Sequence, residues 1–266
     1  MEEWRNNNMQ TKFSRKELER LNCSEEEISL ILKYQKKLPI LVENNSIKGF
    51  SVDARILWEQ LECPQGQFTK WVNRKFKPYG FKENIDFSPS SQISLNGSAS
   101  GVKETIEYFL TIDMAKQLAM IDKKESGFLA RKYFILMEDI VDRNRDWLAI
   151  RDPEKEEYKK MSAEVDAWCF RIWHHHASRA EYAVEADMLN TIVTGKTSQQ
   201  LKSEYGVASN DLIRDYLKKE HNEELLFLEQ QNQVLLLMDM GFTERKNMLN
   251  KMHEVKFKSK EKVVAA

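Results

Sequence analysis

Residues 108–138 have the sequence YFLTIDMAKQLAMIDKKESGFLARKYFILME, in which a strand pattern precedes two helix patterns. The run Ile106–Leu110 is rich in β-favouring residues and predicts a strand. Thr111 is a suitable N-cap for a helix that we expect to continue to about Met120. A longer helix is expected from about Ser126 to Ile150. This order predicts a mixed α+β region, not an all-helical one.

Two segments upstream extend this region. The first is VDARILWEQLE (52–62), where a short strand feeds a helix that Asp53 is placed to cap. The second is FTKWVNRKFKPYGFKENIDF (68–87), which begins with a helical pattern. We expect helices over about 53–62 and 67–76. Three apolar residues of the first helix are expected to face the core: Ile56, Leu57 and Leu61.

The N-terminal flank predicts two short helices, because Ser14 with Glu17 and Ser24 with Glu27 both fit the S-x-x-E capping box. The three-residue turn between them is similar to that of a helix-turn-helix motif. However, the second helix opens with three glutamates, which would face DNA phosphates with negative charge. We therefore favour a small packing appendage over a DNA reader.

The next two segments are expected to contain strands and loops. Pro39 is expected to end the second helix, and Ile40–Val52 is expected to form a hairpin with Asn44 and Asn45 near its tip. Residues 88–101, SPSSQISLNGSASG, hold six serines and no charge. This composition predicts a flexible surface loop between two strands.

The second half of the chain is expected to be entirely helical. Asp152, Pro153 and Glu154 have the order of an N-cap, a first-turn proline and an early acid, so they predict a new helix and a domain boundary. Apolar residues then recur at alternating steps of three and four, at Tyr158, Met161, Val165, Trp168 and Ile172. Helices are expected over about 154–178, 180–193, 197–204, 209–239 with a break near His221, and 243–255.

The fold class is therefore an α+β N-terminal domain, with a small antiparallel sheet and helices, followed by an all-α domain. The expected segments are a helical appendage at 1–39, the α+β domain at 40–152, the helical domain at 153–256 and a disordered basic tail at 257–266.

Composition excludes several functional classes. The 41 Lys and Arg residues balance 42 Asp and Glu residues, so the chain lacks the strong positive charge of a general nucleic-acid binder. Its three cysteines include no CxxC pair, which indicates reduced thiols in a cytosolic protein. The sequence has no Walker loop, GxGxxG, nucleophile elbow or HExxH. We expect neither an enzyme nor a cofactor.

The triplet His174-His175-His176 is the most conspicuous polar cluster. Consecutive helical residues point about 100° apart, so at most two of these imidazoles can approach one metal ion. A polar band on an exposed helix is the favoured interpretation, and a metal-dependent nuclease is the disfavoured one.

The segment from Gln67 to Lys82 combines basic and aromatic residues and has no acidic residue. Part of its aromatic set has helical spacing and is better explained as core. The candidate partner contacts are Lys70, Arg74, Lys75, Lys77, Tyr79 and Lys82. A solvated basic face, contact with an acidic protein surface and contact with nucleic acid all remain open.

Together, the three quoted segments resemble the AntA/AntB antirepressor domain of bacteriophages and prophages. The departures are Trp58, where a histidine is common, and the serine-rich insert. The resemblance implies a protein of the bacterial host cytoplasm that binds and disables a phage repressor. A sequence-specific DNA-binding phage regulator is the alternative, because DNA contact is compatible with the basic segment but not favoured.

The region from about Tyr182 to Met252 is similar to a helical C-terminal module that accompanies KilA-N and other phage regulatory domains. Its leucines suit either a homo-oligomer interface or an internal core, and we favour self-association. These leucines are at positions 225, 226, 228, 235, 236 and 237.

Overall fold

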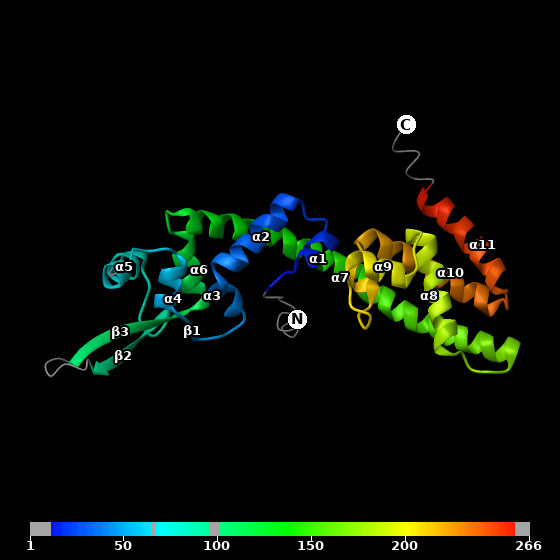
Figure 1. Cartoon of the computed structure of the whole chain (residues 1–266), viewed down its shortest axis with the longest axis horizontal. Helices are drawn as coiled ribbons and strands as arrows, with labels where there is room; N and C mark the ends of the chain where they lie inside the picture. Colours follow the sequence, from blue (N-terminus) through cyan, green and yellow to red (C-terminus); the bar gives the residue numbers. More distant parts are fainter. Residues whose placement is uncertain (1–11, 65–66, 96–101, 259–266) are drawn as a thin grey trace, which may run out of the picture. The chain divides into compact units, whose positions relative to one another are not determined.

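The computed structural model describes residues 12–64, 67–95 and 102–258, and the chain forms two compact units. Unit 1 comprises Met1–Leu18 and Cys23–Asp139, and unit 2 comprises Glu19–Asn22 and Ile140–Ala266. The long helix α7 (Glu125–Trp173, green in Figure 1) contributes residues to both. The expected domain limits at 39/40, 152/153 and 256/257 stay a prediction.

Unit 1 contains a small sheet and several short helices, followed by the first part of α7 (Figure 1). Its other elements are α1 (Arg15–Arg20, whose last two residues belong to unit 2), α2 (Glu25–Lys37), α3 (Pro39–Glu43), β1 (Phe50–Asp53), α4 (Ala54–Gln60), α5 (Phe68–Lys75), the 3₁₀-helix η2 (Lys77–Tyr79), β2 (Phe87–Leu95), β3 (Val102–Thr111) and α6 (Ile112–Met120).

The sheet is antiparallel, in the order β1-β3-β2. Leu110 of the central strand lies opposite Val52 on one side and Phe87 on the other. The α+β prediction for this half is confirmed. The loop prediction is wrong for residues 88–95, which form β2 and pair with β3 as far as Leu95 opposite Val102. A backbone ladder needs no charged side chains, so a serine-rich segment can supply a strand. Residues 96–101 lie outside the described residues.

The helix N-caps at Ser24, Asp53 and Thr111 were predicted correctly. The Ser24 side chain accepts a hydrogen bond from the backbone of Glu27, and the Glu27 carboxylate accepts one from the Ser24 backbone. Asp53 accepts from the first turn of α4, and Thr111 accepts from Met114 at the start of α6. The side-chain oxygens satisfy amides that have no partner inside the helix.

The predicted hairpin over 40–52 is wrong. Pro39 occupies the first turn of α3, whose residues Ile40, Leu41 and Val42 are buried. Proline tolerates this position because the amide that it lacks would have no partner there. α3 packs against α6, and β1 pairs with β3. The apolar run therefore reaches the core as one helical turn, not as a strand.

The core of unit 1 joins its helices to the sheet. The rings of Tyr34 on α2 and Tyr133 on α7 are stacked with centroids 3.6 Å apart. Burial raises the pKa of Tyr133 to about 12. Leu57 and Leu61 are buried as predicted, but Ile56 is exposed. Other fully buried side chains are Leu18, Ile28, Ile31, Leu38, Leu110, Met114 and Leu118.

Unit 2 is helical, as predicted. Besides the second part of α7, its elements are α8 (Arg179–Thr194), α9 (Ser198–Tyr205), the 3₁₀-helix η3 (Ile213–Tyr216), α10 (Lys219–Leu237), α11 (Phe242–His253) and the π-helical turn η4 (Glu254–Lys258). Residues 257 and 258 of the expected disordered tail end η4, and the rest of the tail lies outside the described residues.

The predicted helix break at Asp152-Pro153-Glu154 is wrong, because Pro153 lies inside α7. A proline inside a helix removes one hydrogen bond and crowds the preceding turn. Its neighbours explain why the helix continues. Arg151 and Glu154 are buried and form an ion pair, and Glu154 also pairs with Arg214 of η3. Tertiary contacts on both sides of Pro153 therefore outweigh the local stop signal.

The core of unit 2 uses most of the residues that the helical spacing indicated. Met161, Val165 and Trp168 are buried, whereas Ile172 is exposed, contrary to the prediction. α10 packs against α8 and α11. Four of its leucines belong to this internal core: Leu225, Leu228, Leu235 and Leu236. Leu237 is exposed. The internal-core interpretation thus accounts for most of the leucine-rich pattern.

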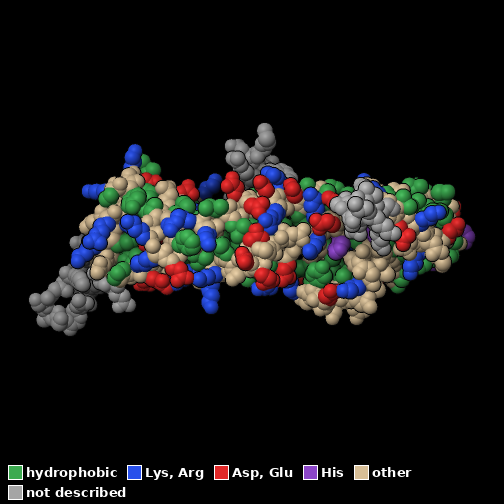
Figure 2. Space-filling view, turned by 90° about the horizontal axis from the view of Figure 1, so that it is seen from above, with side chains coloured by type: hydrophobic (Ala, Val, Ile, Leu, Met, Phe, Trp, Pro, Cys, Tyr) green, Lys and Arg blue, Asp and Glu red, His purple; other side chains and the backbone are tan. Residues whose placement is uncertain are grey.

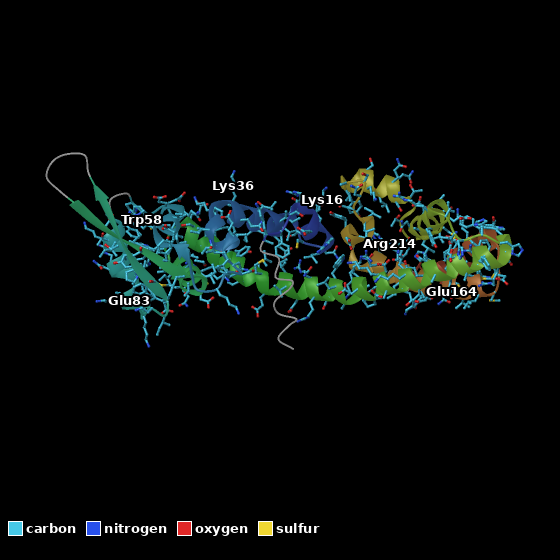
Figure 3. All side chains as sticks on the ribbon, turned by 90° about the horizontal axis from the view of Figure 1, so that it is seen from below. Lys16, Lys36, Trp58, Glu83, Glu164 and Arg214 are labelled. Atoms are coloured by element: carbon cyan, nitrogen blue, oxygen red, sulfur yellow. The ribbon has the colours of Figure 1, made fainter. Side chains whose placement is uncertain are left out.

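Buried charges form a second structural feature of unit 2. The Arg214 guanidinium donates to both Glu154 and Glu229, and Arg151 pairs with Glu154 and Asp215. In Figure 3 Arg214 lies among the helices of this unit. Such a network costs desolvation, so its partners must all be present for it to be tolerated. In the part of the chain that is described, no helix is both long and apolar enough to cross a bilayer.

Candidate partner-binding surface

Helix α5 has one buried face and one exposed basic face. Phe68, Trp71 and Val72 recur at helical spacing and are buried, while Lys70 and Arg74 lie on the opposite side and are exposed. The buried residues explain why this segment forms a helix on the unit 1 core. Its exposed charges are not needed for that packing.

A set of aromatic rings fixes α5 and η2 on the sheet. Phe68 meets the Trp58 ring edge to face at 5.7 Å. Phe76, at the end of α5, packs against Trp71 and against Phe87 of β2, with ring centroids 5.8 and 4.9 Å apart. Aromatic pairs at these separations are favourable beyond the area that they bury. The helix therefore presents its outer face from a rigid base.

We define the α5–η2 surface as the six predicted contact residues, which lie on α5, on η2 and just after η2: Lys70, Arg74, Lys75, Lys77, Tyr79 and Lys82. All except Lys75 are exposed. Figure 2 shows Lys and Arg side chains, in blue, beside apolar ones at the left end of the view, where α5 lies. Among the described residues, no side-chain hydrogen bond or ion pair engages the four exposed cations.

Lys75 differs from the other cations because it has structural contacts. Its ammonium donates to the carbonyl oxygen of Ile121 at 3.3 Å and lies 5.3 Å from the Tyr79 ring centroid. Together with Arg74 it also occupies the last turn of α5, where positive charge offsets the partial negative charge of the helix end. Lys75 and Arg74 therefore contribute to the stability of the fold. Lys70, Lys77 and Lys82 make no comparable stabilising contact among the described residues.

One exposed residue beside this surface was missed by the sequence analysis. Ile85 is 64% exposed in the turn between Lys82 and Asp86, whose carboxylate accepts from the Lys82 backbone at 2.8 Å. A lone apolar residue inside the polar run Glu83-Asn84-Ile85-Asp86 is the available sequence signal. It adds an apolar contact to a mainly cationic surface, a mixture that is typical of protein interfaces.

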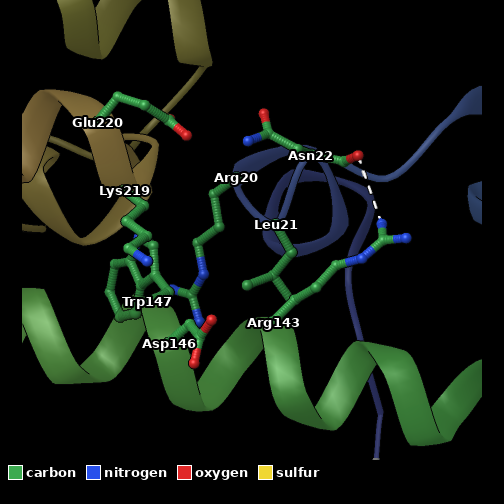
Figure 4. A pocket seen from close by; sticks show the side chains of 8 residues that line it. All are labelled: Arg20, Leu21, Asn22, Arg143, Asp146, Trp147, Lys219 and Glu220. Atoms are coloured by element: carbon green, nitrogen blue, oxygen red, sulfur yellow. Dashed lines mark hydrogen bonds between the residues drawn. The ribbon is translucent and has the colours of Figure 1, made fainter.

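A pocket of about 180 Å³ lies in unit 2, where the end of α1 meets α7 and the start of α10 (Figure 4). The Arg20 guanidinium lies 4.0 Å above the Trp147 ring and donates to the carbonyl oxygen of Asp215. Arg143 donates to the carbonyl oxygen of Asn22 at 3.4 Å. These cations hold neighbouring segments together, so we assign no ligand to this pocket.

The histidine triplet belongs to the turn between α7 and α8. His176 Nδ1 lies 2.9 Å from a carboxylate oxygen of Asp166, and the other oxygen accepts from the backbone of Ala177 at 2.7 Å. The hydrogen bond from His176 lowers the pKa of Asp166. No cluster of three metal-ligating side chains occurs in the described ranges. These contacts give the triplet a structural role in closing the turn.

Comparison with known families agrees with this geometry. The family model of the AntA/AntB antirepressor matches residues 52–124, which include the end of β1, the strands β2 and β3, and the helices α4, α5, η2 and α6. No curated protein matches the chain. The match does not extend into the helical half, so the likeness of residues 182–252 to a KilA-N-associated module stays a prediction. Residues 52–124 of this chain are an AntA/AntB antirepressor domain.

Proposed function

We propose that the protein is a phage antirepressor that binds a prophage repressor through the α5–η2 surface and so favours lytic gene expression. The supporting observation is that this surface lies within the antirepressor domain and exposes four cations that packing does not require. Its partner is a repressor with an acidic, partly apolar surface, because Tyr79 and Ile85 are exposed beside the charges.

The charge of the surrounding region favours a specific protein partner over indiscriminate DNA binding. Residues 40–152 contain 16 Lys or Arg residues and 16 Asp or Glu residues, so the basic surface is local. Complementary charge on a neutral protein mainly steers encounter and selects the partner. General DNA affinity instead comes from neutralising many phosphates at once.

The proposed inhibition is stoichiometric and non-covalent. An antirepressor that competes with operator DNA or with repressor dimerisation lowers the concentration of active repressor by mass action. No turnover is needed, and none of the six surface residues is assigned a chemical role. Inhibition should therefore saturate when antirepressor and repressor reach equal binding-site concentrations.

The direct test is affinity purification of the tagged full chain from lysogenic cells, followed by identification of the proteins that co-elute. A repressor of the same phage should co-elute with the wild-type chain and should be depleted with the double variant Lys70→Glu/Arg74→Glu. Lys36 and Lys48 are exposed elsewhere in the same unit, so Lys36→Glu/Lys48→Glu is the charge-matched control. Failure of every repressor of that phage to bind the purified chain would refute the proposal.

DNA binding through the same cations is the second candidate, favoured by the absence of acidic residues from Gln67 to Lys82. It predicts sequence-dependent retardation of phage DNA that weakens steeply with salt, and Arg74→Glu/Lys77→Glu would abolish it. Retardation by the chain without any repressor present would favour this candidate over antirepression.

We also propose that the helical half self-associates. Val234, Leu237 and Met238 are exposed at the end of α10, although four other leucines of this helix fill the core. Light scattering of the purified chain should give the mass of an oligomer. The Leu237→Glu variant should give a smaller mass, and a monomeric wild-type chain would contradict this part of the proposal.

A further inference from the structure

The part of α7 that belongs to unit 1 has apolar residues on two opposite faces. Leu129 and Tyr133 are buried, and Tyr133 stacks on Tyr34 of α2. On the other face, Phe128 and Ile135 are 53% and 74% exposed. Ile135 has the largest exposed fraction of any large apolar side chain among the described residues. A helix on the surface of a single unit normally turns polar residues outward, so this outer face is suited to a second contact.

Four exposed residues form a row along this outer face, which we call the α7 stripe: Phe128, Lys132, Ile135 and Asp139. Their successive spacings are four, three and four residues, so all four lie within about 60° of one another around the helix. This is the spacing of a seam that packs against another helix. The Lys132 ammonium lies 4.6 Å from the Phe128 ring centroid, so charged and apolar groups share one surface.

The charges of the α7 stripe have opposite signs on the two sides of Ile135. Lys132 precedes Ile135 and Asp139 follows it, seven residues beyond Lys132. Two full turns, about 10 Å along the axis, separate these charges, whereas residues of one helix pair at three or four positions apart. In an antiparallel copy of the helix the order is reversed, so the Lys132 of each copy lies level with the Asp139 of the other. A parallel copy would place like charges opposite each other instead.

We propose that the α7 stripe binds a second copy of this chain, with the two α7 helices antiparallel about a two-fold axis next to Ile135. The two Ile135 side chains then meet at the axis, and two reciprocal Lys132–Asp139 ion pairs flank them. One patch serves both copies, as a two-fold interface requires. A different partner would have to supply the same charges in reverse order around an apolar centre, and the chain itself supplies them.

The contact is short, so the association is expected to be weak. The α7 stripe covers about three helical turns, which bury less area than a standard protein interface, and we expect a Kd on the order of 10–100 µM. Exposed ion pairs contribute little by themselves, so Ile135 should supply most of the affinity and the charges should select the antiparallel arrangement. The α7 stripe lies in unit 1, so this contact is separate from the α10 contact of unit 2 and does not depend on the antirepressor function.

The test uses sedimentation equilibrium of the full-length Leu237→Glu chain, because this substitution removes the contact that we propose for α10. The variant should still form dimers, with a Kd on the order of 10–100 µM. A chain that stays monomeric at about 500 µM would overturn the proposal. Failure of the α10 contact would give a different result, namely the same mass for the wild type and for Leu237→Glu.

Two matched substitutions in the Leu237→Glu background locate the surface. Ile135→Glu should raise the dimer Kd at least about tenfold, because it brings two like charges together at the two-fold axis. Val141 is also exposed on α7, but it lies about 120° around the helix from Ile135. Val141→Glu should therefore leave the Kd unchanged. Equal effects of the two substitutions would contradict the assigned face.

A charge exchange in the same background tests the antiparallel pairing. Lys132→Glu and Asp139→Lys should each weaken the dimer by about 3- to 10-fold, because each places like charges opposite each other. Lys132→Glu/Asp139→Lys restores opposite charges across the interface, so its Kd should return to within about twofold of the starting value. Residues that acted only within their own chain would show no such recovery. A double variant as weak as the single ones would overturn the proposal.

Discussion

Arg55 and Glu107 form a two-pronged ion pair that joins the first turn of α4 to β3. Nε of Arg55 donates to Oε2 of Glu107 at 2.8 Å, and Nη2 donates to Oε1 at 2.6 Å. The guanidinium also lies 4.2 Å above the Phe68 ring at the start of α5. The hydrogen bond to Glu107 raises the pKa of Arg55, despite some opposing desolvation. One arginine thus connects three elements of the antirepressor domain.

Loss of this ion pair should destabilise unit 1. Glu107→Gln keeps the shape of the side chain but removes its charge and one acceptor oxygen, so we expect the free energy of unfolding to fall by about 1–2 kcal/mol. The estimate is modest because Arg55 is partly exposed to solvent. Glu83 is an exposed glutamate of the same unit (Figure 3), and Glu83→Gln should have almost no effect. Urea unfolding curves would measure both changes, and equal effects would contradict the assigned role.

Gly127 should be intolerant of a side chain. A Cβ at this position would lie 2.1 Å from the carbonyl oxygen of Asp122, far closer than van der Waals contact allows. The Arg131 guanidinium donates a hydrogen bond to the same carbonyl oxygen at 2.8 Å, so this carbonyl cannot move away without losing that bond. Gly127→Ala should lower the free energy of unfolding by about 1–3 kcal/mol.

Gly241→Ala is the comparison for this substitution, because an added Cβ at Gly241 meets nothing within 4 Å. Its cost should stay below about 1 kcal/mol, mainly from the loss of an N-cap glycine. Thermal or urea unfolding of the two variants gives the difference. A Gly127→Ala protein as stable as the wild type would show that the turn relaxes without cost.

The sequence predicted those parts of the fold that depend on local signals. The caps at Ser24, Asp53 and Thr111 were predictable because each uses a side chain within three residues of the amide that it satisfies. Helix α5 was predictable because Phe68, Trp71 and Val72 have helical spacing. The same spacing separated core aromatics from the exposed basic residues.

The errors arose where distant contacts decide the structure. Pro153 is tolerated in α7 because Arg151 and Glu154 pair with residues sixty or more positions away, which no local pattern reveals. The serine-rich strand β2 exists because β3 pairs with it along its length. For the surface residues, spacing could not show that Lys75 is engaged with Ile121 or that Ile85 is exposed.

Charge reversal on the α5–η2 surface should separate binding from folding. Lys70→Glu/Arg74→Glu should weaken the complex with the repressor at least about tenfold, because like charges then face each other at the interface. The free energy of unfolding should fall by no more than about 1 kcal/mol, since both side chains are exposed and only Arg74→Glu places an acid in the last turn of α5. Calorimetric titration with the purified repressor measures the first effect, and urea unfolding measures the second.

Lys75→Glu should differ from that double variant. It removes the donor to the Ile121 carbonyl, a contact that neither Lys70 nor Arg74 makes, so it should lower stability as well as affinity. If the Lys70→Glu/Arg74→Glu protein binds the repressor as tightly as the wild type does, this face of α5 does not contact the repressor.

The last prediction concerns Glu229, a carboxyl group buried in the charge network of unit 2. Burial and the nearby charge of Glu154 raise its pKa to about 8, even though the adjacent Arg214 favours its ionised form. Arg214 is shared between Glu229 and Glu154, so its charge only partly offsets the cost of burying an ionised Glu229, and a proton on Glu229 removes that cost. Near neutral pH the folded protein therefore binds a proton that the unfolded chain releases.

The direction of the pH dependence follows from this proton. Between the ordinary pKa of 4.5 and the folded value of about 8, the folded state holds more protons, so the stability contributed by this group falls as pH rises. The slope approaches about 1.4 kcal/mol per pH unit for one proton. Glu229→Gln imitates the protonated carboxyl group and should flatten the dependence, leaving the variant more stable than the wild type at pH 8. Glu156→Gln is the control, because Lys159 lowers the pKa of that exposed acid and keeps it ionised throughout this range. Urea unfolding at intervals from pH 5 to pH 8 tests the prediction, and equal slopes for the wild type and Glu229→Gln would show that Glu229 is ionised in the folded protein.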